Sequence, residues 1–119
     1  MKLFWTQEAL RRLEEIEEYI AMDNPDAAVN FIDKLISLAD TIPENPEKGR
    51  IVPELSIEYI RELLHKNYRI VYLIKNKSVE VLTIFEGHQL LKKNDIIRSQ
   101  WTFNRHYAEY DIHSFIVNN

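Results

Sequence analysis

The sequence predicts an α+β domain, in which a small antiparallel β-sheet packs against an N-terminal α-helical hairpin. Apolar residues recur at helical spacing through much of residues 7–42, which indicates two amphipathic helices. Three short runs follow at residues 59–64, 68–74 and 79–85, rich in the Ile, Val, Leu and Tyr that suit a pleated strand. The helices need an apolar partner, and the sheet is the only one the chain offers. With 119 residues, a single domain is expected.

A first strand is predicted at the apolar run of residues 3–5, ahead of the first helix. Thr6 is a good N-cap, and Glu8 in the first turn complements the helix dipole. The helix is predicted over residues 7–22, because apolar side chains return every three or four positions: Leu10, Leu13, Ile16 and Ile20.

The second predicted helix begins after a turn at residues 23–25. Asn24 can cap this helix, and Pro25 suits its first position. The helix should end near Ile42, because Pro43 cannot continue it. Two helices joined by so short a turn form an α-hairpin.

The three later strands should form consecutive hairpins, because their connections at residues 65–67 and 75–78 are short and polar. Strict alternation along residues 68–74 places Tyr68, Ile70, Tyr72 and Ile74 on one face and Arg69, Val71 and Leu73 on the other. The same rule places Val79, Val81 and Thr83 on one face of the last strand. Glu80, Leu82 and Ile84 then lie on its other face. Beyond Gly87, residues 90–97 suggest a short helix, and residues 99–119 have no clear period.

Positive charge is concentrated on the predicted sheet, although the whole chain carries a net charge of −4. Residues 1–47 carry net −7, residues 48–77 net +4 and residues 78–119 net −1. The overall acidity argues against a general nucleic-acid binder. The local positive field over the sheet is what steers a polyanion.

Several classes of protein are excluded by composition. The chain has no cysteine, which rules out a disulfide scaffold and a thiolate metal site and fits a reducing cytoplasm. No apolar run approaches the roughly 18 residues of a membrane span, and the charged N-terminus is unlike a signal peptide. No Gly-rich phosphate loop, Ser/His/Asp signature or zinc motif occurs, and His106 and His113 lack close carboxylates. We therefore expect a cytoplasmic protein without cofactor or metal.

Arginines on neighbouring predicted strands are the first candidates for chemistry. Arg61 and Arg69 stand where an apolar residue would suit a strand, and each offers a planar fork of donors for phosphate. On one sheet face, with Lys66 at the hairpin, they would form a cradle for a phosphodiester. The alternative is that these arginines simply pair with nearby carboxylates: Glu62, Glu80 or Glu86.

His88 is the first candidate for proton transfer. It follows the last strand directly, and a neutral imidazole can take or give a proton near pH 7. Glu54 and Glu86 are possible general bases. The alternative is that all three are solvated loop residues.

Several short motifs occur in a specific order along residues 1–97. They are Trp5-Thr6, Tyr19-Ile20-Ala21, the run from Asp23 to Ala28, the run from Gly49 to Glu54, Ile60-Arg61-Glu62-Leu63, the run from Asn67 to Tyr72, and Val79-Glu80-Val81-Leu82. In this order and spacing the chain resembles the RelE/ParE toxin superfamily of bacterial toxin–antitoxin modules. The resemblance suggests a toxin domain over residues 1–97 and a C-terminal extension over residues 98–119.

The resemblance implies a cognate antitoxin and two alternative targets. In the ribonuclease branch, a basic face cuts messenger RNA on the ribosome. Arg69 and Arg61 then match catalytic arginines, and His88 falls at or next to a catalytic position. Substrate binding is assigned to Lys66, Arg50 and Glu54.

Other features resemble the ParE-like branch, whose better-known members poison DNA gyrase. These features are the turn at residues 23–25 and the Arg-Glu-Leu run at residues 61–63. The acidic overall charge also departs from ribosome-directed toxins, which are usually basic. Many relatives also carry His-Gly-Arg where this chain has Glu86-Gly87-His88. The first expectation is a ribosome-dependent endoribonuclease; the alternatives are a non-enzymatic gyrase inhibitor or a degenerate antitoxin-binding module.

Overall fold

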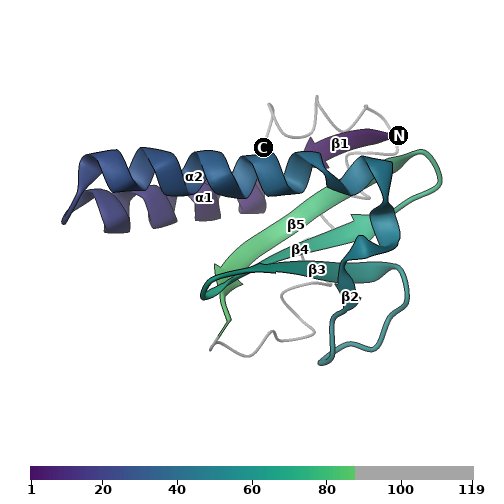
Figure 1. The fold of residues 1–119 in the computed structure, drawn as a ribbon. Coiled ribbons are helices and arrows are strands. Elements are labelled where there is room, and N and C mark those ends of the chain that lie inside the picture. The colour runs from purple at the N-terminus through teal and green to yellow at the C-terminus, as the bar shows by residue number, and fades with distance from the viewer. Residues whose placement is uncertain (88–119) are drawn as a thin grey trace.

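The computed structural model describes residues 1–87, which form a helical hairpin laid on one face of a five-stranded sheet (Figure 1). The elements in chain order are β1 (Lys2–Trp5), α1 (Gln7–Ala21), α2 (Pro25–Asp40), the 3₁₀ turns η1 (Ile42–Glu44) and η2 (Pro46–Lys48), β2 (Arg50–Ile51), β3 (Ile60–His65), β4 (Tyr68–Ile74) and β5 (Ser78–Glu86). The predicted α+β class is confirmed.

The sheet has the order β1-β5-β4-β3-β2 and is mixed rather than purely antiparallel. Strands β2 to β5 pair antiparallel, as expected. Strand β1 pairs parallel with β5, so the expectation of an all-antiparallel sheet is wrong at this edge. No tight turn joins β1 to its neighbour. The helical hairpin and three further strands intervene, so the chain is free to bring β5 back in the same direction.

Both helices begin where their capping residues predict. Thr6 accepts a hydrogen bond from the Ala9 amide at 3.1 Å, and its hydroxyl lies 3.0 Å from the Val81 carbonyl oxygen, which ties α1 to β5. Asn24 accepts from the Ala27 amide at 3.0 Å. The helices end at Ala21 and Asp40, one and two residues before the predicted ends. No helix among residues 1–87 is long and apolar enough to cross a membrane.

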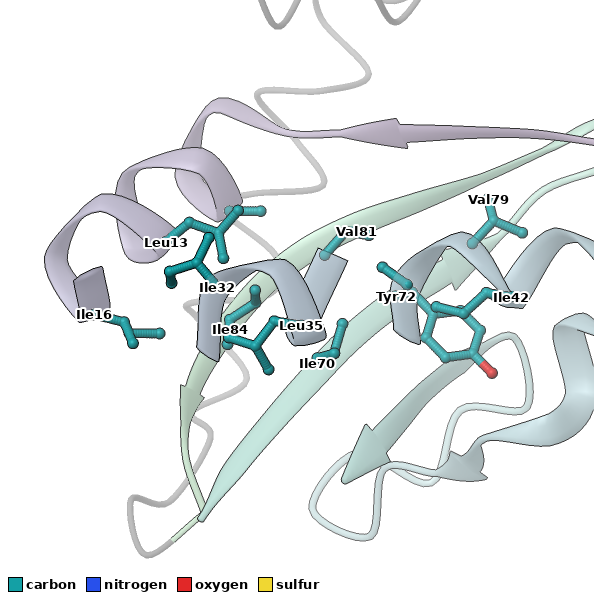
Figure 2. Close-up of a cluster of buried hydrophobic side chains, with 12 residues drawn as sticks. Leu13, Ile16, Ile32, Leu35, Ile42, Ile70, Tyr72, Val79, Val81 and Ile84 are labelled. Carbon is teal, nitrogen blue, oxygen red and sulfur yellow. The ribbon is translucent and has the colours of Figure 1, made fainter. Parts of the chain in front are cut away.

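The main core lies between the helices and the sheet (Figure 2). Helix α1 contributes Leu13 and Ile16, and α2 contributes Ile32 and Leu35. The sheet face that they cover carries these buried residues: Ile70, Tyr72, Val79, Val81 and Ile84. The predicted alternation of side chains along β4 is therefore confirmed.

A β-bulge in β5 changes which of its residues face the helices. Val71 pairs with Thr83 but Tyr72 pairs with Val81, so Leu82 is an extra residue on β5. An extra residue shifts the alternation of all that follow. Ile84 consequently joins Val81 in the main core, and the prediction that it opposes Val81 is wrong.

The opposite face of the sheet carries a second buried cluster, formed by Val52, Ile60, Val71, Leu73, Leu82 and Phe85. Glu80 is fully buried on this face of β5. Its Oε1 accepts a hydrogen bond from the Ser78 hydroxyl at 2.6 Å, and its Oε2 has no hydrogen-bond partner among residues 1–87. Burial raises the pKa of the Glu80 carboxyl, while Ser78 and the positive charge of Lys75 oppose the rise.

Glu80→Gln should stabilise the protein at neutral pH. Because the pKa of Glu80 is raised in the folded chain, its unfavourable ionisation lowers the free energy of unfolding as pH rises above about 4.3, the ordinary glutamate value. The variant should gain on the order of 1 kcal/mol at pH 7 and almost nothing below about pH 4. Urea titrations at both pH values measure this, with the exposed Glu86→Gln as control. An equal gain at both pH values would contradict the assignment.

Candidate functional site

A buried ion-pair cluster joins β2, β3, β4 and the loop between β2 and β3. Arg69 on β4 donates from Nε to Glu62 at 2.6 Å and from both terminal nitrogens to Glu54 at 2.7 Å. Glu62 also accepts from Arg50 Nε at 2.6 Å. We name Arg50, Glu54, Glu62 and Arg69 the ion-pair cluster. Its two arginines and two carboxylates leave it without net charge.

The Arg69 guanidinium is the inner cation of this cluster. Its side chain is 6% exposed, that of Glu62 is 0% exposed, and that of Glu54 is 22% exposed. The guanidinium carbon also lies 4.7 Å from the centre of the Phe85 ring. The hydrogen bonds to Glu54, and then those to Glu62, raise the pKa of Arg69 above its ordinary value against the effect of burial. Arg69 therefore remains charged while largely withdrawn from solvent.

Arg69 does not lie open on its sheet face, as the predicted phosphodiester cradle would require. The residue is 5% exposed, because the loop carries Glu54 over its outer side and Glu62 reaches it from the neighbouring strand. Of the partners that the sequence suggested, Glu62 is one. Glu54 was assigned to substrate, yet it binds Arg69. A catalytic role for Arg69 stays a prediction.

Arg61 lies on the other face of the sheet from Arg69. It is opposite Tyr72 in the β3–β4 register, and Tyr72 points toward the helices. Its guanidinium donates to the Glu58 carbonyl oxygen at 3.1 Å and to the Gly49 carbonyl oxygen at 3.0 Å. The predicted two-arginine cradle is therefore not formed. Glu62, the next residue along β3, occupies the face that Arg61 would have needed.

Tyr72 positions the segment that carries Arg50. Its hydroxyl donates to the Pro46 carbonyl oxygen at 2.6 Å and accepts from the Gly49 amide at 3.0 Å. A Cβ at Gly49 would lie 2.5 Å from the Tyr72 hydroxyl oxygen and 2.6 Å from the Glu62 carbonyl oxygen, so only glycine fits. No local pattern in the sequence indicates this contact; the one available signal is that Gly49 is one of only 2 glycines in the chain.

A pocket of about 240 Å³ lies beside the ion-pair cluster, at the turn between β3 and β4. Arg50, Lys66 and Arg69 line it together with Leu64, Asn67, Tyr68 and Gly87. Three of the predicted site residues thus meet at one place, and Arg61 is not among them. His88 follows Gly87 but lies outside the described residues, as do the predicted helix at residues 90–97 and the extension at residues 98–119.

The lining of this pocket is suited to an anion. Lys66 lies in the turn with a left-handed backbone (φ 53°). Arg50 binds Glu62 through Nε, and its side chain, which ends in the two terminal nitrogens, is 55% exposed. Among residues 1–87, no three His, Cys, Asp or Glu side chains are grouped so that they could hold a metal ion. The arrangement can bind a phosphate or carboxylate group by charge and hydrogen bonds.

Comparisons with known proteins agree with this fold and order of elements. Residues 3–91 match the family model described as ParE toxin of type II toxin-antitoxin system, parDE. The putative toxin Y4kP of Sinorhizobium fredii is 39% identical over 90 residues, which are 74% of this chain and 90% of that protein. The toxin RelE2 of Caulobacter vibrioides is 33% identical over 90 residues, 75% of this chain and 98% of that protein.

A solved structure shows the same fold. It is described as the chromosomal ParDE TA system from P. aeruginosa, and it matches with a TM-score of 0.62 and 21% identity, over 72% of this chain and 95% of that one. The family model and the two related toxins together identify the chain as a toxin of the RelE/ParE superfamily. The chain belongs to the ParE toxin family of type II toxin–antitoxin systems.

Arg69→Ala should destabilise the fold as well as change the site. The substitution leaves the buried Glu62 and the largely covered Glu54 without their shared cation, and breaking such a buried pair costs about 3–5 kcal/mol. The free energy of unfolding by urea measures the loss. Arg11→Ala removes two exposed ion pairs, with Glu8 and Glu15, and serves as control, with an expected loss of about 0–1 kcal/mol. Equal losses would argue against a buried cluster.

Proposed function

We propose that this type II toxin inhibits growth by binding its target rather than by cutting RNA, and that the target is DNA gyrase. The observation that carries the proposal is that the Arg69 guanidinium is already paired: its Nε and both terminal nitrogens donate to carboxylates. A type II toxin implies a cognate antitoxin, which is its protein partner. The proposed place of action is the cytoplasm, where gyrase acts.

Contact between Arg69 and a scissile phosphate would first require the displacement of Glu54. That exchange removes a bidentate, charge-assisted pair from a largely buried guanidinium, and hydrogen bonds to charged groups are worth about 1.5–3 kcal/mol each. Arg61 cannot replace Arg69, because it lies on the opposite face and binds the carbonyl oxygens of Glu58 and Gly49. A ribonuclease would therefore begin with its principal arginine already occupied.

Endoribonuclease activity on the ribosome remains the second candidate, and the pocket at the β3–β4 turn favours it. Arg50, Lys66 and Arg69 line that pocket beside Gly87, and the next residue is His88. In this proposal the arginines and Lys66 hold the phosphate, Glu54 contacts the substrate after it releases Arg69, and His88 transfers the proton. Arg61 would act only by holding the segment that carries Arg50.

Parallel assays separate the two candidates. The purified chain should inhibit supercoiling of relaxed plasmid by gyrase, and it should leave ribosome-bound messenger RNA intact. The same chain saturated with its antitoxin is the control and should neither inhibit supercoiling nor cut message. Cleaved message with normal supercoiling would overturn the first proposal and establish the second.

His88→Gln tests the second candidate directly. In a ribonuclease, the loss of general acid–base help should slow cleavage by about 10²–10⁴-fold while ribosome binding stays nearly intact. The cleavage rate of the wild-type chain should also depend on pH near neutrality. In a gyrase inhibitor the variant should keep its toxicity, because no proton is transferred at a scissile bond. Induction in growing cells and primer extension on message provide the two measurements.

A further inference from the structure

A second pocket lies where α1 passes the end of β5 and the start of β4. Its volume is about 180 Å³, below the roughly 300–1,000 Å³ of a small-molecule site, so it suits a single side chain of a protein partner. Two tyrosine rings, Tyr19 of α1 and Tyr68 of β4, line it together with the carboxylates of Glu15 and Glu86. Arg12 is the one cation that residues 1–87 contribute to the lining. We name it the α1–β5 pocket.

Glu86 supplies the uncompensated charge of the α1–β5 pocket. Arg12 donates to Glu8 at 3.0 Å, and Glu15 accepts from Arg11 at 3.1 Å, so α1 largely neutralises its own charges here. Glu86 is exposed at the end of β5 and forms no ion pair with another residue of the described part of the chain. Its carboxylate is therefore available to a cation that enters the pocket from outside.

The two rings are placed to hold such a cation. Tyr68 packs edge-on against Phe31 with 5.3 Å between the ring centres, which limits the orientations of its ring. Burial, and then the charge of Glu86, raise the pKa of Tyr68, as expected where a carboxylate lies close to a phenol. The stem of a lysine or arginine packs well on apolar surface, and its charged head is attracted to the face of an aromatic ring.

Tyr19 also connects the pocket with an uncovered apolar surface. The joined ends of α1 and α2 extend beyond the sheet (Figure 1), and there Tyr19 is 74% exposed and Met22 87% exposed. Exposed carboxylates surround them at Glu18, Asp23 and Asp26, and none of these forms an ion pair within residues 1–87. An apolar surface with acidic surroundings is complementary to a partner that is apolar and basic.

We propose that the α1–β5 pocket receives a lysine or arginine side chain from the basic, DNA-binding surface of gyrase. The cationic head pairs with Glu86, and the stem packs between the rings of Tyr19 and Tyr68. A surface that holds DNA is rich in Lys and Arg, because it must neutralise phosphates. The inference rests on the proposed function and names the contact by which the toxin binds that target. A nucleic acid does not fit the pocket, because its phosphates would meet Glu86 and the acidic end of the hairpin.

A change of charge at Glu86 tests the contact on the full chain with purified gyrase. Glu86→Lys should weaken binding to gyrase, and inhibition of supercoiling, at least about tenfold, because a like charge then meets the incoming cation. Glu44→Lys is the matched control, since it makes the same change in net charge at another exposed residue. It lies in η1, which packs beside β1 and the first half of β5, whereas Glu86 ends β5. Its affinity should remain within about twofold of the wild type.

Tyr19→Ala tests the ring. The loss of a cation–π contact and of apolar packing should weaken gyrase binding about threefold or more. Tyr59→Ala removes a ring that is 51% exposed ahead of β3, and it should leave the affinity within about twofold. If both groups hold one side chain, Tyr19→Ala should cost much less in the presence of Glu86→Lys than in the wild type. Strictly independent effects would contradict a shared side chain.

Growth and co-purification separate this inference from the proposed function. Glu86→Lys should lose toxicity and still co-purify with the antitoxin, whereas Glu44→Lys should stay toxic. A wild-type chain without effect on gyrase would overturn the proposed function and this inference together. A wild-type chain that inhibits gyrase, with Glu86→Lys equally potent or Glu44→Lys equally weakened, would overturn this inference alone. Loss of antitoxin binding by Glu86→Lys with gyrase inhibition unchanged would also overturn it, since the pocket would then contact the antitoxin.

Discussion

The pairing of Arg69 with Glu62 and Glu54 is the constraint on which this side of the sheet depends. A buried carboxylate costs several kcal/mol unless a cation and hydrogen bonds compensate it, and Glu62 is fully buried. Arg69 satisfies Glu62 across β3 and β4 and holds Glu54 at the same time, so one guanidinium fixes the loop between β2 and β3. Arg50 completes the arrangement from the surface. The cost of unpairing any member explains why this irregular loop can take one conformation.

The two faces of the sheet stabilise different parts of the structure. The face toward the helices is apolar, and its Tyr72 reaches past the core to bind Pro46 and Gly49. Arg61 reinforces the same segment from β3. Arg61, a candidate for catalysis from the sequence, thus holds backbone in place. The ionic groups of the other face are set among Val71, Phe85 and their neighbours, where a low dielectric strengthens each pair.

Membership of the family defines a toxin, but the target depends on which surfaces remain available. The charges of Arg69, Glu62 and Glu54 are largely buried, while Lys66 and the 55% exposed Arg50 line the pocket at the β3–β4 turn.

The sequence by itself determined the helices, their caps, the strands of the hairpins and the alternation of side chains along β4, because these follow from local spacing and capping chemistry. It also placed Arg50, Lys66 and Arg69 on the region that forms the pocket. Only the tertiary structure decided the parallel pairing of β1, the bulge at Leu82, the opposite faces of Arg61 and Arg69, and the pairing of Arg69 with Glu54, fifteen residues away. These features arise from contacts between distant segments, and no local propensity encodes which carboxylate a loop will carry to which arginine.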